Sequence, residues 1–256
     1  MKRAFIIHGW DFNPNMNWYP WLKKELEKKG YGVVVPIMPH TSKPKIDDWV
    51  SHVKKVVGKL DDQTYFVGHS MGCQAIMRYL EKENYLGKVG KIVFVAGWLK
   101  LNNLEGKEVE NIARPWLETP IDQKKPEDSI LSRTTPWFLS TIRILIKNSE
   151  VENGDEWGLF VSLKIRCGKD LRTDFAIHRG VGDFANFYDF NKVKEKTGQI
   201  TIFLSSNDPY GYLEYNFHMF KKNLGAKVII LKDKGHFTGD DGVTQLNNIL
   251  EELNEN

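Results

Sequence analysis

Residues 64–83 read TYFVGHSMGCQAIMRYLEKE, and the rest of the chain can be interpreted outward from them. The stretch begins with a short apolar run rich in strand formers. It passes through Gly-x-Ser-x-Gly at residues 68–72 and continues with the spacing of an amphipathic helix. In this strand–turn–helix context we expect side chains at Gly68 and Gly72 to collide with neighbouring backbone. The stretch therefore predicts Ser70 as a nucleophile on a tight turn. The alternative is a glycine-rich loop that happens to contain a serine.

Short apolar runs alternate with amphipathic helical runs on both sides of this stretch. Strands are expected at residues 3–8, 31–36, 64–68, 91–97, 199–206 and 226–231, and helices at 17–30, 45–60, 73–83, 213–225 and 242–253. Apolar strands that alternate with helices are typical of a parallel sheet covered on both faces. The sequence thus predicts an α/β fold with a mainly parallel sheet of about six strands.

A serine hydroxyl needs a base to take its proton and a carboxylate to orient that base. In folds with this motif the partners follow in the order Ser, Asp, His. Asp208 follows the strand expected at 199–206, and His236 follows the strand expected at 226–231. Ligands bind at the carboxyl ends of strands in open α/β sheets. The order and positions therefore predict Ser70 as nucleophile, Asp208 as orienting acid and His236 as general base.

The other candidate side chains have plainer interpretations. His69 adjoins Ser70, but neighbours on a tight turn point apart, and His8 is expected to hold the loop after the first strand by hydrogen bonds. Cys73 is interpreted as a small buried residue. The remaining histidines, expected to be solvated, are His40, His52, His178 and His218, and the acidic residues expected to cap or turn before the last helix are Asp240 and Asp241.

Five separate motifs resemble one family of proteins. They are IIHGW, WYPWLKKELEKKGYGVVVPIMP, VGHSMGCQAIMRYL, SSNDPYG and KGHFTGDDGVTQL. In order and spacing they resemble the small serine hydrolases of the α/β-hydrolase superfamily. That family includes retinoblastoma-binding serine hydrolase and the YdeN-type bacterial proteins. The resemblance covers roughly residues 1–122 and 190–256, and it implies an α/β-hydrolase fold with Ser70, Asp208 and His236 in the roles given above.

An oxyanion hole built from two backbone N–H groups is expected beside Ser70. One belongs to Met71, directly after the nucleophile, and the other to Trp10 in the loop after the first strand. A shift of that loop by one residue would substitute Asp11 for Trp10. Trp10, Trp18 and Trp21 crowd this region, where we expect core packing, with substrate contact as the alternative.

The middle of the chain breaks the alternation. In compact members of the resembled family, the link between the strands expected here at 91–97 and 199–206 is short. Residues 113–122 and those from 190 onward look like the two halves of that link. Residues 123–189 are therefore interpreted as an insertion within a single domain of residues 1–256. Within the insertion we expect a hairpin at 157–178 and a helix or a strand at 134–148. The insertion is either a lid that shapes substrate access or a neutral addition away from the pocket.

Composition excludes several classes of function. The 256 residues are 41% hydrophobic, and the net charge of +3 comes from lysines mixed with glutamates, which argues against a nucleic-acid partner. The two cysteines do not suggest a disulfide framework or a zinc site. The chain has no run of eighteen apolar residues, and the first apolar run, in MKRAFIIHGW, is too short for the core of a signal peptide. A cytoplasmic protein is therefore expected.

These observations lead to an expected activity. We expect hydrolysis of an acyl bond in a small-molecule substrate. A small carboxyl ester is the first substrate class expected, and an amide or aminoacyl ester is the second. No metal or organic cofactor is expected. The alternatives are a protein-interaction module with little turnover and acyl transfer to an acceptor other than water. The oligomeric state does not follow from the sequence.

Overall fold

The computed structural model describes residues 1–102, 104, 106–118, 159–167, 170–179 and 189–254, with the backbone alone described for 159–167 and 170–179. The chain divides into two compact units. One comprises Met1–Ile121 and Phe187–Asn256, and the other Asp122–Asn186. The second unit overlaps the segment 123–189, whose role as a lid or a neutral insertion stays a prediction.

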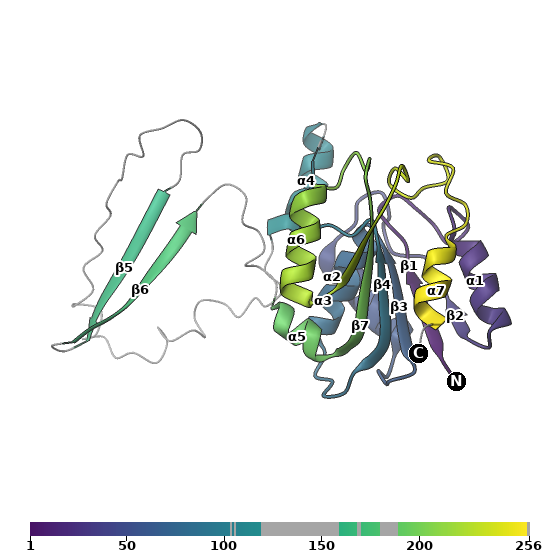
Figure 1. Ribbon diagram of the computed structural model, residues 1–256, viewed down its shortest axis with the longest axis horizontal. Helices are drawn as coiled ribbons and strands as arrows, with labels where there is room; N and C mark the ends of the chain where they lie inside the picture. The colour runs from purple at the N-terminus through teal and green to yellow at the C-terminus, as the bar shows by residue number, and fades with distance from the viewer. Residues whose placement is uncertain (103, 105, 119–158, 168–169, 180–188, 255–256) are drawn as a thin grey trace. The chain divides into compact units, whose positions relative to one another are not determined.

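The first unit is built on a six-stranded sheet in the order β2-β1-β3-β4-β7-β8 (Figure 1). Its strands are β1 (Arg3–Ile7), β2 (Gly32–Val34), β3 (Thr64–His69), β4 (Val89–Val95), β7 (Thr197–Ser205) and β8 (Lys227–Leu231). Every neighbouring pair is parallel. After β1 the chain runs to the β2 edge and then returns to β3 on the other side of β1. Such a reversal of strand order places a crevice at the carboxyl ends of β1 and β3.

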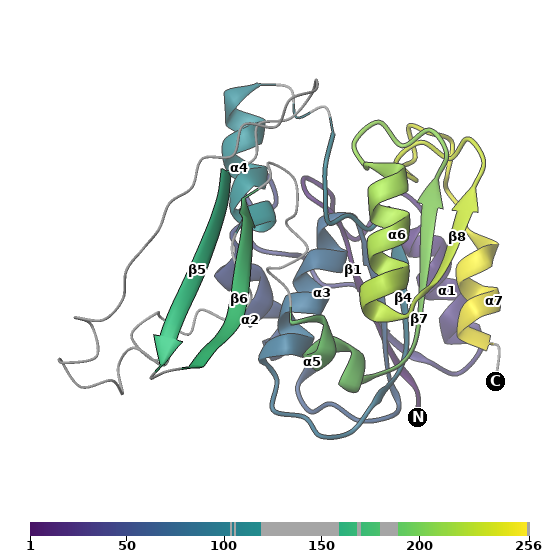
Figure 2. The ribbon, with the colours of Figure 1, turned by 60° about the vertical axis from the view of Figure 1, so that its left-hand side comes forward.

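Helices cover both faces of this sheet. They are α1 (Tyr19–Lys28), α2 (Ile46–Val57), α3 (Met71–Lys82), α4 (Lys107–Glu118), α5 (Phe190–Glu195), α6 (Leu213–Leu224) and α7 (Asn247–Asn254). Helices α1 and α7 lie against one face, and α2, α3 and α6 lie against the other (Figures 1 and 2). The sequence prediction of a six-stranded sheet with helices on both faces is confirmed.

Two apolar cores result from the alternation of side chains along the strands. Phe5 and Phe66 point into the core under α2, α3 and α6, whereas Ile6 and Val67 point into the core under α1 and α7. All four side chains are almost fully buried. Because both faces are covered, the central strands contain nearly continuous apolar runs, as parallel sheets require.

Two local predictions differ from the structure. The last helix begins at Asn247, five residues later than expected, because residues 238–243 form hydrogen-bonded turns and Gly242 has a φ of 76°. Helix α5 was not predicted, and neither was helix α4, because residues 113–122 and those from 190 onward were interpreted only as the two halves of a link. The apolar residues Ala113 and Trp116 of α4 are nevertheless buried at helical spacing.

The second unit contains two described strands. β5 (Leu159–Cys167) and β6 (Asp170–Arg179) pair antiparallel, which confirms the predicted strand pair. The turn residues 168–169 and the segment 134–148 lie outside the described residues.

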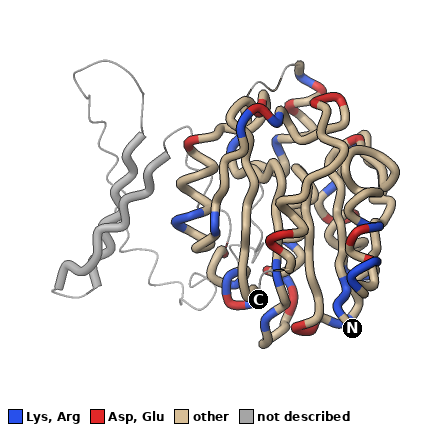
Figure 3. The backbone as a smooth tube through the Cα atoms, turned by 45° about the vertical axis from the view of Figure 1, so that its right-hand side comes forward, with Lys and Arg blue, Asp and Glu red and all other residues tan. Residues whose placement is uncertain are grey.

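Charged residues are scattered over the first unit. Figure 3 shows basic and acidic positions interspersed along the chain, and the described ion pairs are mostly exposed. None of the described helices is both long and apolar enough to cross a membrane. The cytoplasmic location expected from the sequence stays a prediction.

Candidate active site

Ser70 occupies a strained turn between β3 and α3. Its φ is 51° and its ψ is −116°, a conformation that non-glycine residues rarely adopt. A Cβ at Gly68 would lie 2.9 Å from the Cys73 backbone nitrogen, and one at Gly72 would fall against the carbonyl oxygens of Ile7 and His8. The predicted collisions at both glycines are therefore confirmed. Hydrogen at Gly68 lets β3 pass close to the start of α3, and hydrogen at Gly72 lets α3 pass close to the end of β1.

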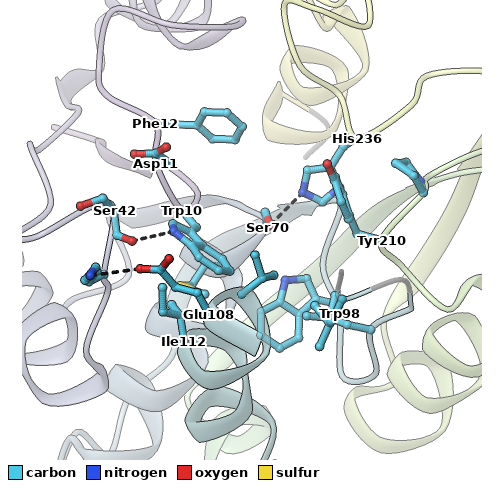
Figure 4. Close-up of a pocket in the computed structure, with 16 residues that line it drawn as sticks. Trp10, Asp11, Phe12, Ser42, Ser70, Trp98, Glu108, Ile112, Tyr210 and His236 are labelled. Carbon is cyan, nitrogen blue, oxygen red and sulfur yellow. Dashed lines mark hydrogen bonds and ion pairs between the residues drawn. The ribbon is translucent and has the colours of Figure 1, made fainter. Parts of the chain in front are cut away.

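Ser70, His236 and Asp208 form a continuous chain of hydrogen bonds. The Ser70 Oγ lies 2.9 Å from His236 Nε2 (Figure 4), and His236 Nδ1 lies 3.0 Å from each carboxylate oxygen of Asp208. All three side chains come from loops at the carboxyl ends of strands, as the sequence predicted. Asp208 accepts a hydrogen bond from the Nδ1–H of His236, which leaves the Nε2 lone pair facing the serine hydroxyl. The arrangement is the one a serine needs in order to lose its proton to a base.

Asp208 keeps its negative charge in this environment. Burial raises the pKa of its carboxyl group, but the hydrogen bonds from His236 and from the N–H groups of Tyr210 and Gly211 outweigh burial and leave the pKa below its ordinary value. A charged Asp208 stabilises a positive His236 beside it.

The two predicted oxyanion donors line the same crevice. The N–H of Met71 is the first of helix α3, so it has no acceptor within the helix. Trp10 lies in the loop after β1, and among the described residues its backbone N–H donates to no protein group. The N–H of Asp11, the alternative considered above, donates to Thr41 O at 2.9 Å. The geometry therefore favours Trp10 over Asp11 as the second donor.

The backbone of residues 38–44 holds the loop that carries Trp10. Two bonds reach the loop itself: the N–H of Asp11 donates to Thr41 O at 2.9 Å, and Trp10 Nε1 donates to Ser42 O at 3.1 Å. The N–H of Met38 donates to His8 Nε2 at 3.2 Å. The supporting segment is itself fixed by bonds from Trp49 Nε1 to Pro39 O (2.7 Å) and from Trp116 Nε1 to Pro44 O (3.1 Å). His8 also contacts Gly9 O through Nδ1 at 2.9 Å, so its predicted loop-holding role is confirmed. Its buried ring has a lowered pKa and stays neutral.

Asp241 shapes the loop that carries His236. Its carboxylate accepts from the N–H of His236 at 2.9 Å, from the N–H of Thr238 at 3.0 Å and from the Thr238 hydroxyl at 2.6 Å. The sequence left two roles open for Asp241, a cap of the last helix or a turn residue before it. The cap is wrong, because α7 begins only at Asn247, and the turn role is confirmed. Sequence reasoning missed that this turn residue holds the histidine backbone.

The remaining predictions have mixed outcomes. His218 is exposed, as expected, whereas His52 is half-buried. The His178 side chain lies outside the described residues. Trp18 is fully buried and donates from Nε1 to Phe237 O at 3.1 Å, which confirms core packing. Cys73 is fully buried, and burial raises the pKa of its thiol.

A cavity of about 840 Å³ opens in front of Ser70 (Figure 4). Its apolar wall comes from the β4–α4 region and from α4, through Trp98, Leu101, Leu104, Val109 and Ile112. Its rim carries Asp11, Lys43 and Glu108, of which Lys43 and Glu108 form an exposed ion pair at 3.1 Å. Trp10 also lines the cavity, so the alternative of substrate contact applies to Trp10 rather than to Trp18 or Trp21. Among the described residues no group of three or more His, Cys, Asp and Glu side chains could hold a metal ion.

Residues 4–124 match the family model described as serine hydrolase. The matched residues make up just under half of the chain. The candidate hydrolase YdeN of Bacillus subtilis (strain 168) is 36% identical to this chain over 99 residues, which are 39% of this chain and 52% of YdeN. The match thus spans about half the length of that relative.

Solved structures extend the likeness to nearly the whole chain. The structure of the Bacillus subtilis ydeN gene product covers 99% of this chain and 97% of its own, with a TM-score of 0.64 and 20% identity. The carboxylesterase CesB (YbfK) from Bacillus subtilis covers 99% of this chain and 84% of its own, with a TM-score of 0.51 and 14% identity. At these identities the likeness concerns the fold, which is the α/β-hydrolase fold predicted from the sequence.

Proposed function

We propose that this protein is a serine hydrolase that cleaves carboxyl esters through an acyl-enzyme on Ser70. The observation that carries the proposal is the 2.9 Å contact between Ser70 Oγ and His236 Nε2 on a strained turn, backed by Asp208. A turn that costs free energy to form is expected where it serves a mechanism. The esterase activity named for CesB, a protein of like fold, is consistent with this reaction.

The reaction follows from the placement of the three side chains. His236 Nε2 takes the hydroxyl proton while Ser70 Oγ bonds to the carbonyl carbon of the ester. The carbonyl oxygen becomes an oxyanion and accepts from the N–H groups of Met71 and Trp10. When the intermediate collapses, the bond to the alcohol oxygen breaks and His236 returns its proton to the leaving alcohol. Water then attacks the acyl-enzyme by the same route, which releases the acid and restores Ser70.

The cavity favours an ester with an apolar group. Its volume of about 840 Å³ lies within the range of sites that enclose drug-sized ligands. A group longer than acetyl would cover Trp98 and Ile112, and each buried methylene contributes about 0.8 kcal/mol. We therefore expect turnover of p-nitrophenyl esters to rise from acetate to medium-length acyl chains. Amides and aminoacyl esters are the next substrate classes to try.

The first experiment is labelling of the full chain with a fluorophosphonate probe, which reacts with activated serines. Wild type should label, whereas Ser70→Ala and His236→Ala should not. Labelling that persists in Ser70→Ala would place the reactive group elsewhere and overturn the assignment. A folded wild type that neither labels nor hydrolyses any ester of the series would instead favour the interaction-module alternative. Acyl transfer would appear as a new ester when an added alcohol competes with water.

A further inference from the structure

His69, the residue before Ser70, is fully buried, and both of its ring nitrogens are bonded. Its Nδ1 lies 2.6 Å from the hydroxyl oxygen of Tyr19, and its Nε2 lies 2.8 Å from the backbone carbonyl oxygen of His236. The ring also stacks on Phe12, with centroids 5.4 Å apart and planes 4° from parallel. The side chain thus connects the start of α1 to the backbone of the predicted general base.

These two contacts fix the tautomer of His69. A carbonyl oxygen only accepts hydrogen bonds, so the Nε2 that faces His236 carries the proton. In a neutral imidazole the other nitrogen is then an acceptor, so the Tyr19 hydroxyl donates to Nδ1. Burial lowers the pKa of His69 to about 3 and raises the pKa of Tyr19, so both side chains are neutral near pH 7.

The segment before α1 supports the same loop at two further points. Asn17 donates from Nδ2 to the Tyr19 hydroxyl at 3.2 Å and accepts from the N–H of Gly239 at 2.9 Å. Trp18 Nε1 donates to Phe237 O at 3.1 Å. Residues 17–19, together with His69, therefore hold the backbone of residues 236–239 from outside the loop.

The loop needs such support because its backbone is bent on both sides of His236. Gly235 has a φ of 54° and Phe237 a φ of 58°. A positive φ at a bulky residue costs free energy and persists only where the surroundings impose it. Without the bond from His69, the backbone of His236 would be held less firmly, and the position of the His236 imidazole ring would be less restricted.

We propose that His69 and Tyr19 are positioning residues for His236: Tyr19 keeps the His69 proton on Nε2, and that N–H holds the His236 backbone where its side chain can reach Ser70. This inference rests on the proposed function for its catalytic consequence. The alternative is that His69 only fills the core behind the turn. The two differ in which substitutions restore activity, because core filling needs volume and positioning needs an N–H donor.

The first test compares two tyrosines. Tyr19→Phe removes a hydroxyl that donates to His69, whereas Tyr79→Phe, a matched control on α3, removes a buried hydroxyl that has no hydrogen-bond partner among the described residues. Loss of one such bond is expected to lower kcat for a p-nitrophenyl ester about tenfold in Tyr19→Phe, with KM unchanged. Tyr79→Phe should retain the wild-type kcat. Equal kcat values in both variants would overturn the proposal.

The second test replaces His69 itself. His69→Phe keeps a ring of similar volume but no donor, and a small displacement of His236 is expected to lower the rate of fluorophosphonate labelling by about 10²-fold. His69→Gln retains an N–H donor and should recover most of that rate. If Phe were tolerated better than Gln, His69 would be a core filler. Adding Tyr19→Phe to His69→Phe should cost less than Tyr19→Phe costs in wild type, because the hydroxyl then has no imidazole to orient and only its contact with Asn17 is lost.

The last measurement does not depend on catalysis. A ¹⁵N-labelled chain should show the His69 imidazole by NMR with its proton on Nε2 in wild type and in Ser70→Ala, and a mixture of tautomers in Tyr19→Phe. A proton on Nδ1 in wild type would overturn the proposal even if the enzyme is active. A wild type that fails to label but shows the expected tautomer would count against the proposed function and leave the hydrogen-bond chain in place.

Discussion

The Ser70 Oγ and His236 Nε2 atoms lie 2.9 Å apart, but the chain holds the two residues in place by different means. Ser70 is positioned by backbone contact: β3, α3 and β1 approach so closely that Gly68 and Gly72 have no room for a Cβ. His236 is positioned by side chains, chiefly Asp241 from within its loop and His69 from outside it. Close backbone packing thus positions Ser70, whereas side-chain hydrogen bonds position His236.

The difference teaches how each half should respond to change. Close packing has no intermediate arrangement, so a single added methyl group on the Ser70 side should have a large effect. Hydrogen bonds are individually modest and can be removed one at a time. They also include groups that take up protons, so the His236 side should respond to pH where the Ser70 side does not.

The largest effect is expected from Gly72→Ala. The new Cβ would meet the carbonyl oxygens of Ile7 and His8, which belong to β1 and its loop and cannot move independently. We expect a loss of about 4 kcal/mol in the free energy of unfolding, or failure to fold. Gly97→Ala is the matched control, because its Cβ would make only ordinary contacts, the nearest at 3.5 Å. Equal urea midpoints for the two variants would refute the shape argument.

The next effect is a loss of stability in acid that depends on His69. Because its folded pKa is about 3, against about 6.5 in an unfolded chain, the unfolded state binds one more proton between these values. Stability conferred by the neutral ring is therefore complete above pH 6.5 and falls as the pH drops toward 3, by about 1.4 kcal/mol per pH unit. His69→Gln lacks this proton site. Urea unfolding from pH 7 to pH 4.5 should give a steeper decline for wild type, and parallel curves would contradict the expectation.

The smallest effect is expected from Asp241→Ala. The carboxylate is exposed, so losing its bonds to His236 and Thr238 should cost about 1 kcal/mol of stability. Turnover should fall more than stability suggests, because the loop around His236 loosens. Asp240→Ala, next to it in the chain, serves as the control and should leave both quantities near wild type. A drop in turnover for Asp240→Ala as large as that for Asp241→Ala would show that the local bonds do not matter.

The sequence predicted the backbone half of the site better than the side-chain half. Gly-x-Ser-x-Gly between a strand and a helix is a local pattern, and the collisions expected at Gly68 and Gly72 follow from the turn itself. Asp208 and His236 could be located because each follows an apolar strand. The six-stranded sheet followed from alternation along the chain.

The supports of His236 could not be predicted, since they depend on which distant segments meet. Nothing local to Tyr19 distinguishes it from a core tyrosine, and His69 could be excluded as a base without revealing what it bonds. Helix α4, which forms part of the apolar wall of the cavity, was missed because residues 113–122 were interpreted as one half of a link between strands. In each case the deciding fact was a tertiary contact.

The long reach of the His236 supports has a consequence for how the protein is made. His69 and His236 are separated by 167 residues, and Trp18 and Phe237 by 219. At the usual pace of 5–20 residues per second, a ribosome needs roughly 10 to 30 seconds to pass from the first histidine to the second. During that interval the chain lacks His236, the proposed base for the Ser70 proton. On the proposed mechanism, a half-made chain therefore cannot hydrolyse esters, whatever the state of its sheet.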